Sequence, residues 1–305
     1  MLSKWTVDNI PDLTGKVTII TGANSGLGYE DARALAYKGA TVILACRNME
    51  KGEIALQQIR RWHSEARVEL MQLDLADLAS IHNFANEFNG KYSKLDILIN
   101  NAGLMFPPFM TTTDGFELQF GTNHLGHFAL TGLLLDHIIN TPKARVVNVS
   151  SLAHRFFSKI DFYNLNAETA YNRISAYCQS KLANLLFTFE LQRRFKTNRI
   201  DAIAVAAHPG LTSTNLKRYS PRWSNIFGQL ITQKPEIGAL PTLYAATAPD
   251  VKGGDYYGPS GLMELRGYPA RAKISKKAYD KTVADRLWMI SKELTGVQYH
   301  QLSKK

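Results

Sequence analysis

The amino-acid sequence predicts an α/β fold, in which a doubly wound parallel sheet of about seven strands is flanked by helices. Short runs rich in Val, Ile and Leu alternate with helical stretches through the first two thirds of the 305 residues. The runs show no polar alternation, which is typical of strands that are buried on both faces of a parallel sheet. A glycine-rich turn joins the first run to the first helical stretch, which fits a right-handed strand–helix–strand crossover.

The predicted elements follow in order along the chain. Apolar, β-rich composition predicts strands at Lys16–Thr21, Thr41–Ala45, Arg67–Leu73, Leu95–Asn100, Ala144–Val149 and Ile200–Ala207. Apolar residues three and four positions apart predict helices at Gly26–Lys38, Glu50–Trp62, Ala79–Phe88, Phe116–Ile139, Tyr177–Phe195 and near Lys276–Leu294. Gly39 ends the first helix in the manner of a C-cap glycine. No linker divides the chain, so residues 1–305 are predicted to form a single domain, with a C-terminal extension from about residue 260.

Composition restricts the class of protein. With 45% hydrophobic and 20% charged residues, the chain has enough apolar material for a full core. No uninterrupted apolar run is long enough to span a bilayer, and the N-terminus lacks the apolar region of a signal peptide. Cys46 and Cys178 give neither a disulfide framework nor a metal cluster. These features predict a soluble, cytoplasmic protein without a transmembrane segment.

The net charge of +10 suggests an anionic partner. A phosphate-bearing cofactor or an anionic membrane surface would fit, so peripheral membrane contact stays open, and a merely basic solvated surface fits as well. Nucleic acid is not an expected partner, because no basic run carries interleaved aromatic residues. No metal is expected either, since His124, His127, His154 and His208 lack metal-ligand spacing.

The turn Thr21–Gly28 reads Thr-Gly-Ala-Asn-Ser-Gly-Leu-Gly and opens the first predicted helix. Gly22 allows a tight turn, Gly26 lets the backbone approach a pyrophosphate, and Gly28 allows close packing of helix against strand. The helix N-terminus adds free N–H groups and partial positive charge. The turn therefore predicts a dinucleotide site of the Rossmann type. Its other lining residues are predicted to be Asn24, Ser25 and Leu27.

Arg47 indicates which dinucleotide binds. An NAD site usually carries Asp or Glu about 20 residues after the turn, at the end of the second strand, to bind the ribose hydroxyls. That strand ends here in Leu-Ala-Cys-Arg-Asn, without a carboxylate. A guanidinium pairs well with phosphate oxygens, so Arg47 is predicted to bind the 2′-phosphate of NADP(H). A role as an ordinary surface residue is the alternative.

Tyr177 and Lys181 lie four positions apart in a predicted helix, which places both side chains on one face. An ammonium beside a phenol favours the phenolate and lowers the pKa of the tyrosine, which would suit Tyr177 to acid–base work near neutral pH. The spacing alone is weak evidence, because a solvated helix face often produces it. Its occurrence together with Ser151 and the glycine turn favours chemistry. Cys178 points about 100° away from Tyr177 and is interpreted as structural.

These motifs, in this order, resemble the classical short-chain dehydrogenase/reductase family over about residues 14–260. The resemblance implies a set of catalytic residues, which are Asn123, Ser151, Tyr177 and Lys181. It also implies that Asp74 binds the adenine amino group and that a Pro-Gly segment holds the nicotinamide carboxamide. Besides the glycine turn and Arg47, the implied cofactor-binding residues are Asp74, Leu75, Asn101, Ala102, Gly103, Tyr177, Lys181, Pro209, Gly210, Thr212 and Thr214.

The resemblance implies hydride transfer between NADP(H) and a carbonyl or alcohol, with the protein positioning and polarising the substrate. In this scheme Tyr177 donates a proton to the developing alkoxide, and Ser151 binds the substrate oxygen and stabilises its charge. Lys181 lowers the pKa of Tyr177 and binds the nicotinamide ribose. Asn123 orders a water that links Lys181 to solvent.

Four segments indicate which branch of this family the chain resembles. Ala45–Arg47, Thr122–Phe128, Tyr177–Asn184 and Gly254–Pro259 resemble retinol-dehydrogenase-type members, a branch that is predominantly NADP-linked. The resemblance implies a lipophilic aldehyde, ketone or alcohol as substrate. Unlike many members of that branch, this chain shows no N-terminal hydrophobic anchor segment, which argues against retinol itself.

Two segments near the predicted site have open roles. The resemblance implies a mobile substrate lid near 212–235, and the aromatic and aliphatic residues there suit either a lipophilic substrate or packing on the body. Ser151 and Tyr177 are 26 positions apart, which is longer than in compact family members. The extra segment Ala153–Ile174 carries Phe156, Phe157, Phe162 and Tyr163, and it either walls the substrate pocket or packs against the body.

Two other functions and the oligomeric state stay open. One alternative is a relative that reduces a carbon–carbon double bond. The other is a cofactor-binding sensor or scaffold without turnover, against which the complete set of four catalytic residues argues. The two long helices Phe116–Ile139 and Tyr177–Phe195 form the dimer interface in many family members, but members of this branch vary, so a homodimer on these helices is one open alternative.

Overall fold

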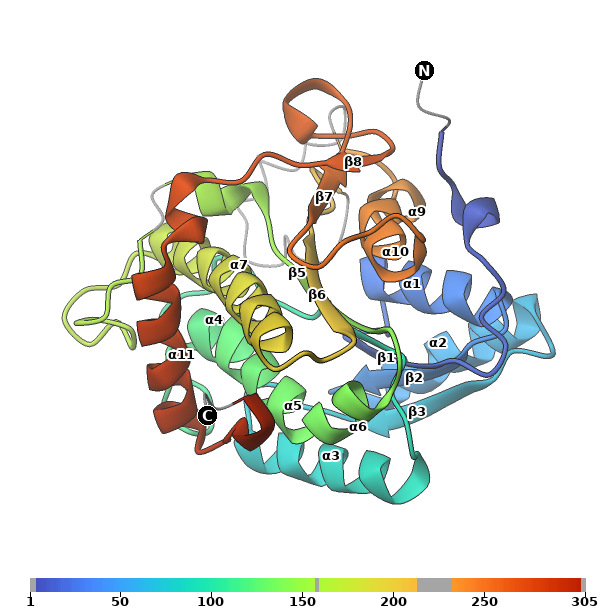
Figure 1. Cartoon of the computed structure of the whole chain (residues 1–305), viewed down its shortest axis with the longest axis horizontal. Helices are drawn as coiled ribbons and strands as arrows, with labels where there is room; N and C mark the ends of the chain where they lie inside the picture. Colours follow the sequence, from blue (N-terminus) through green and yellow to red (C-terminus); the bar gives the residue numbers. More distant parts are fainter. Residues whose placement is uncertain (1–3, 157–158, 213–231, 303–305) are drawn as a thin grey trace.

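The computed structural model describes residues 4–156, 159–212 and 232–302, and an eight-stranded sheet lies at its centre. The spatial order is β3-β2-β1-β4-β5-β6-β7-β8, and each neighbouring pair is parallel except β7 with β8. The strand order reverses direction between β1 and β4, as in a doubly wound sheet (Figure 1). The strands are β1 (Val17–Thr21), β2 (Thr41–Cys46), β3 (Val68–Gln72), β4 (Ile97–Asn100), β5 (Ala144–Val149), β6 (Ala202–Ala207), β7 (Tyr256–Pro259) and β8 (Pro269–Arg271).

Helices cover both faces of the sheet (Figure 1). Side chains of neighbouring strand residues point to opposite faces, so Ile20 joins one hydrophobic core and Ile19 the other. One face is covered by α1 (Gly26–Tyr37), α2 (Met49–Trp62) and α10 (Leu240–Thr247). The other is covered by α3 (Leu78–Lys91), α5 (Gly126–Leu133), α6 (Leu135–Asn140) and α7 (Arg173–Thr197). The predicted α/β fold is therefore confirmed.

The sheet has eight strands where the sequence predicts about seven. Two strands lie beyond the six that the sequence locates: β7, and β8, which is three residues long and pairs antiparallel with β7 at the edge of the sheet. Strand β8 contains Pro269, which is tolerated in an edge strand because proline lacks the N–H that a second neighbour would need. So short a strand leaves no apolar pattern in the sequence.

The helix predicted at Phe116–Ile139 is not continuous. It consists of α4 (Leu118–Phe120), the π-helical segment η2 (Gly121–Leu125), and then α5 and α6. The glycines at the two ends of η2 lie directly against other parts of the chain. A Cβ atom on Gly121 would come within 2.4 Å of Thr112 Cγ2, and one on Gly126 within 2.4 Å of the Leu75 carbonyl oxygen. These tertiary contacts set the helix path, which apolar periodicity cannot show.

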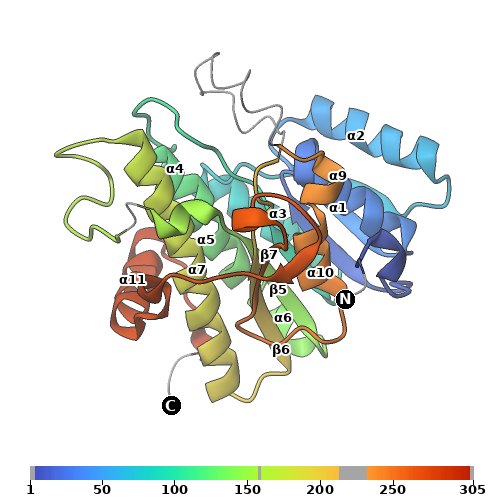
Figure 2. The same cartoon turned by 90° about the horizontal axis from the view of Figure 1, so that it is seen from above.

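The helix α7 begins four residues before its predicted start, because Asn172 caps it by accepting hydrogen bonds from Ile174 N and Ser175 N. The loop that precedes α7 projects from the body of the molecule (Figure 2). The C-terminal helix α11 (Lys281–Thr295) packs against α7 and α5, with Trp288 between Phe128 and Phe187. A homodimer on the two long helices stays an open alternative. Among the described residues, no helix is both long and apolar enough to cross a membrane.

Candidate active site

The glycine turn leads from β1 into α1 and has the backbone geometry that only glycine adopts freely. Gly22 and Gly26 have φ angles of +68° and +57°, in the left-handed region. Gly28 is packed so closely that a Cβ atom would lie 2.5 Å from Asn101 Nδ2 and 2.7 Å from the Gly22 carbonyl oxygen. The side chain of Ser25 makes no capping hydrogen bond, so the first amides of α1 remain available to an anion.

Thr21 ties this turn to the end of β4. Its hydroxyl oxygen accepts hydrogen bonds from the backbone amides of Asn101 (3.0 Å) and Ala102 (2.9 Å), and the Asn101 side chain donates to the Thr21 carbonyl (2.8 Å). The Thr21 hydroxyl also lies 2.9 Å from His127 Nε2, and burial lowers the pKa of this imidazole to about 4. The imidazole of His127 is therefore neutral and holds Thr21 in place beside the turn. The sequence motifs assign no role to this histidine.

The other residues predicted at the turn line its two sides. Asn24 and Ser25 belong to the turn itself, and Ala102 lies against Gly22, whose Cβ atom would be 3.0 Å from that of Ala102. Leu27 is buried and faces Gly238 of α9 (Pro235–Gly238), where a Cβ atom would lie 3.0 Å from Leu27 Cδ2.

Arg47 and Asp74 follow β2 and β3 at the outer end of the same edge. The Arg47 side chain is 65% exposed, and its Nε atom is 3.9 Å from Asp74 Oδ2. Asp74 is anchored, since its Oδ1 atom accepts from Ala76 N (2.9 Å) and its amide donates to Ser80 Oγ (2.9 Å). Leu75 is buried against Gly126. A mobile guanidinium next to a fixed carboxylate thus lies where the sequence places the adenosine end of the cofactor.

Asn123 lies in η2 and holds the loop that follows β4. Its Oδ1 atom accepts from Leu104 N (2.9 Å), and its Nδ2 atom donates to Leu104 O (3.0 Å) and to Ser180 Oγ (3.0 Å). Gly103 lies against this amide, because a Cβ atom there would be 3.1 Å from Asn123 Oδ1 and 3.4 Å from Lys181 Nζ. Residues from β4, η2 and α7 therefore meet at one point.

Lys181 is almost completely buried, and its ammonium donates to the Val149 carbonyl at 3.1 Å. Burial lowers the pKa of Lys181 to about 8. Its Nζ atom is 5.8 Å from the centre of the Tyr177 ring. The ammonium thus faces the ring and the end of β5.

Tyr177 does not show the lowered pKa that the sequence predicts. Burial raises the pKa of Tyr177 to about 12, although a hydrogen bond with Ser151 works in the opposite direction. The Lys181 ammonium donates to the Val149 carbonyl and not to the phenol, so the effect of burial on the Tyr177 pKa prevails. In this structure the phenol is therefore a protonated group held beside Ser151, whose Oγ atom also accepts from Ala153 N (3.2 Å).

The Pro-Gly segment follows β6, and its Thr212 lies against Gly238, which also lies against Leu27 of the glycine turn. Gly210 has a φ angle of +65°, and its amide donates to His208 Nδ1 at 3.2 Å. The Pro209 carbonyl accepts from Thr212 Oγ1 (2.9 Å) and Gln233 Nε2 (2.8 Å). Thr214, and most of the lid predicted at 212–235, lie outside the described residues.

A charged cluster that the sequence analysis missed braces this segment. The Glu264 carboxylate pairs with Arg155 and with His208 Nε2 (3.1 Å), and its Oε1 atom accepts from Lys273 N (3.0 Å). Burial alone would raise the pKa of Glu264, but bonds from His208, the Lys273 amide and Arg155 lower it to about 2. Nearby, His154 Nδ1 lies 2.6 Å from the Ser151 carbonyl. No motif marks these residues, because each meets its partners only in the folded chain.

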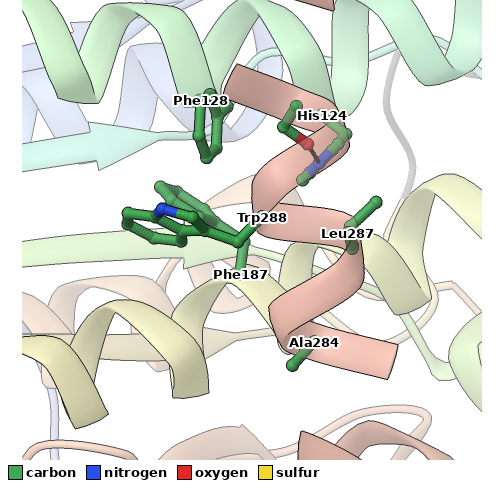
Figure 3. Close-up of a pocket in the computed structure, with 7 residues that line it drawn as sticks. His124, Phe128, Phe187, Ala284, Leu287 and Trp288 are labelled. Atoms are coloured by element: carbon green, nitrogen blue, oxygen red, sulfur yellow. Dashed lines mark hydrogen bonds between the residues drawn. The ribbon is translucent and has the colours of Figure 1, made fainter. Parts of the chain in front are cut away.

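A small hollow, separate from the site above, lies between η2, α5, α7 and α11, where Figure 3 shows His124 among aromatic rings. It is too small to hold a water molecule. The His124 Nε2 atom is 2.9 Å from Ser291 Oγ, and burial lowers the pKa of His124 to about 3. This hollow is part of the core. Within the described parts of the chain, no group of acidic, histidine or cysteine side chains could hold a metal ion.

The site has two parts. A glycine-lined cradle that suits a dinucleotide lies at the carboxyl edge of a doubly wound sheet, and it adjoins a cluster of Ser151 and the buried Tyr177 and Lys181. This combination is typical of a nucleotide-dependent enzyme. Comparison of sequences agrees, since the sequence model of the short chain dehydrogenase family matches residues 16–225. The chain belongs to this family of oxidoreductases.

Two curated relatives place it in the retinol-dehydrogenase-like branch. Retinol dehydrogenase 11 of Homo sapiens is 41% identical over 301 residues, which cover 97% of this chain and 91% of that protein. Retinol dehydrogenase 13 of Homo sapiens is 43% identical, with coverage of 94% of this chain and 86% of that protein.

Solved structures support the same fold. An uncharacterised protein from Mycobacterium paratuberculosis is 42% identical and superimposes with a TM-score of 0.82, covering 97% of this chain and 99% of that one. A short chain dehydrogenase from Shigella flexneri, complexed with NADP, is 22% identical with a TM-score of 0.64, covering 80% of this chain and 97% of that one. At that identity the second likeness concerns the fold alone.

Proposed function

We propose that this protein is an NADP(H)-dependent oxidoreductase that transfers a hydride between the nicotinamide and a lipophilic carbonyl or alcohol. The observation that carries the proposal is the meeting of Asn123, Ser151, Tyr177 and Lys181 at one sheet edge, beside Gly103. A glycine cradle that any Cβ atom would fill, and uncapped amides at the start of α1, fit the pyrophosphate of a dinucleotide. When bound there, the cofactor supplies the hydride donor or acceptor.

The chain's own residues have distinct roles in this proposal. Tyr177 stays protonated at neutral pH and donates its proton to the oxygen of a carbonyl as that oxygen gains charge. Ser151 lies next to the phenol and stabilises the same oxygen by a hydrogen bond. Lys181 binds the nicotinamide ribose. Asn123 holds the loop at Leu104, and the water relay through it stays a prediction, since its amide is bonded to Leu104 and Ser180.

The substitution Tyr177→Phe tests the reaction. We expect kcat for aldehyde reduction to fall by about 10²–10⁴-fold, because the proton donor is lost, while the affinity for the dinucleotide changes little. The measurement is oxidation of NADPH by the purified protein against a panel of lipophilic aldehydes and ketones. Tyr279→Phe is a matched control, since Tyr279 is 58% exposed and distant from the proposed donor in sequence. Equal turnover by Tyr177→Phe and the parent protein would exclude this assignment.

The preference for NADP(H) over NAD(H) rests on Arg47. Its side chain is largely exposed and lies 3.9 Å from Asp74, so it is free to turn toward a 2′-phosphate. In Arg47→Ala we expect KM for NADPH to rise about tenfold, which corresponds to about 1.4 kcal/mol, while KM for NADH stays unchanged. An unchanged KM for NADPH would mean that Arg47 does not bind the phosphate.

Two observations support a lipophilic substrate. The curated relatives are named for retinol, an apolar alcohol. The aromatic ring of Phe106 packs edge-on against Tyr177, with 5.2 Å between ring centres. Binding of NADPH without turnover on any member of the panel would instead favour reduction of a carbon–carbon double bond or a sensor role. Cytoplasmic location remains a prediction of the sequence, and the homodimer stays an open alternative.

A further inference from the structure

Phe156, Phe162 and Tyr163, the described aromatic residues that suggested a wall between Ser151 and Tyr177, make no ring contact with Tyr177. Phe156 and Tyr163 are 56% and 91% exposed, and the ring of Phe162 lies under the Arg286 guanidinium at 4.1 Å. Phe157 lies outside the described residues. Among the residues that the structure describes, the aromatic ring paired with Tyr177 belongs to Phe106, in the loop after β4.

Phe106 is held in an unfavourable backbone conformation. Its φ angle is +60°, in the left-handed region that β-carbon sterics disfavour, so other contacts must maintain it. The amide of Phe106 donates to Gln119 Oε1 at 2.9 Å. The ring is partly buried, and its plane makes an angle of 76° with that of Tyr177. Phe106 thus presents an apolar surface directly beside the proposed proton donor.

Gln119 connects this loop to the segment before α7. The side chain is completely buried, and its Nε2 atom donates to Tyr171 Oη (3.0 Å) and to the Arg173 carbonyl (3.0 Å). With Oε1 accepting from Phe106 N, both amide protons and one acceptor site are used, which fixes the orientation of the group.

Tyr171 also bonds directly to the loop after β4 that carries Phe106. Its hydroxyl donates to the Pro107 carbonyl at 3.0 Å, and its ring packs edge-on against Phe109, with 5.4 Å between centres. A cavity of about 130 Å³ adjoins Tyr171 and is lined by Glu117, Ser175 and other polar residues. Packing therefore leaves space beside the ring, and the hydrogen bonds of the hydroxyl are what fix its position.

We propose that Phe106 is a specificity-determining wall of the substrate site, and that the segment before α7 sets its position through Tyr171 and Gln119. The inference rests on the proposed function, which makes Tyr177 the proton donor. Phe106 contacts the apolar substituent of a carbonyl substrate bound at Tyr177 and limits its width. Gln119 and Tyr171 are positioning residues, because they contact the Phe106 loop and not Tyr177.

The wall is tested by the ratio of kcat/KM for a slim aldehyde, hexanal, to that for a wide one, biphenyl-4-carbaldehyde, with NADPH. We expect Phe106→Ala to shift this ratio at least about tenfold toward the wide substrate, because the pocket loses its lateral contact. Tyr171→Phe removes only the hydroxyl and should shift the ratio in the same direction by about threefold. Tyr163→Phe removes the exposed hydroxyl of the same segment and should leave the ratio unchanged.

A double variant separates positioning from a general structural effect. If Tyr171 acts through Phe106, adding Tyr171→Phe to Phe106→Ala should not shift the ratio further. An equal loss of kcat/KM for both aldehydes in Tyr171→Phe would overturn the positioning role, and an unchanged ratio in Phe106→Ala would overturn the wall.

Hydrogen exchange gives a readout that does not require turnover. The Phe106 amide should exchange faster in Tyr171→Phe than in the parent protein, and Tyr163→Phe should match the parent. Unchanged exchange would overturn the positioning role alone. Absence of turnover by the parent with both NADPH and NADH would instead overturn the proposed function and the wall with it, so the two failures are distinguishable.

Discussion

The cofactor side and the substrate side of this site are built differently. On the cofactor side, the side chains of Thr21 and Asn101 bond to each other's backbone groups, and a Cβ atom on Gly28 would lie 2.5 Å from the Asn101 side-chain amide. On the substrate side, the loops after β4, β5 and β6 are held by side chains from distant parts of the chain, such as Gln119 and Glu264. The first side combines glycine backbone geometry with contacts between the ends of the neighbouring strands β1 and β4, and the second depends on side chains that link loops to one another.

Left-handed backbone conformations show the same contrast. On the cofactor side they occur at Gly22 and Gly26, which adopt them without steric cost. On the substrate side they occur at Gly210 and also at Phe106, Met263 and Glu264, where a β-carbon makes each cost about 1–2 kcal/mol. Such residues persist only where neighbouring contacts compensate. The substrate side is therefore the part whose shape depends most on the rest of the molecule.

Lowering the pH should decrease the unfolding free energy of the protein, and this is the largest effect that we expect. Burial lowers the pKa of four histidines, two of which, His154 and His208, brace the substrate side; the others are His124 and His127. Below about pH 6.5 the unfolded chain takes up protons at these positions and the folded chain does not. His124, His127 and His154 therefore each remove up to about 1.4 kcal/mol of unfolding free energy per pH unit, and His208 acts in the same direction.

Other buried groups modify this acid response. Burial raises the pKa of Asp31 and of Glu117, so their ionised forms destabilise the folded protein at neutral pH. Protonation on acidification removes this destabilisation and offsets part of the decrease in unfolding free energy that the histidines cause. The lowered pKa of Glu264 adds a further loss only below about pH 4.5. Urea unfolding at pH 7.5, 6.5 and 5.5 would measure the balance. We expect a net decrease of about 3 kcal/mol per pH unit below pH 6.5, and a flat profile would show that these imidazoles are protonated in the folded protein.

The substitution Gly28→Ala tests the cofactor side. The new methyl group would collide with the Asn101 amide and the Gly22 carbonyl, so we expect the unfolding free energy to fall by about 1–3 kcal/mol. The dissociation constant of NADPH should rise at least about tenfold. Gly90→Ala is the control, because a Cβ atom there meets nothing within 4 Å and alanine favours the helix α3. An unchanged dissociation constant of NADPH in Gly28→Ala would contradict the assignment of the glycine turn as the dinucleotide site.

Asp31 is an exception on the cofactor side and gives the smallest expected effect. It is fully buried in α1, and neither carboxylate oxygen has a hydrogen-bond partner among the described residues. We expect Asp31→Ala to raise the unfolding free energy at pH 7 by about 1 kcal/mol. Since the folded-state pKa of Asp31 is raised, the gain should shrink as the pH falls toward 4. Glu87→Ala, which loses an exposed pair with Lys91 in α3, is the control and should not stabilise the protein.

The same contrast explains what the sequence could predict. Strands with consecutive apolar residues were predictable to within one or two residues, and Ala144–Val149 agrees at both ends. The residues of the glycine turn, and the group around Tyr177, follow from motifs whose spacing places them at one sheet edge. These patterns concern local geometry.

The missed features depend on partners far away in the chain. Gln119 bonds to Phe106, 13 positions before it, and to Tyr171, 52 positions after it. Glu264 meets His208 across 56 positions. The raised pKa of Tyr177 follows from its burial, which the Tyr-x-x-x-Lys spacing does not encode. Phe106, with its left-handed backbone, carries no sequence signal at all.

The π-helical segment η2 has a consequence for how this chain can change in length. A π turn holds one residue more than an α turn, so deleting His124 or Leu125, which separate Asn123 from α5, would rotate Asn123 by about 100° relative to α5. Its amide would then lose both Leu104 and Ser180. Insertions and deletions should therefore be rare between Asn123 and Gly126 among related proteins.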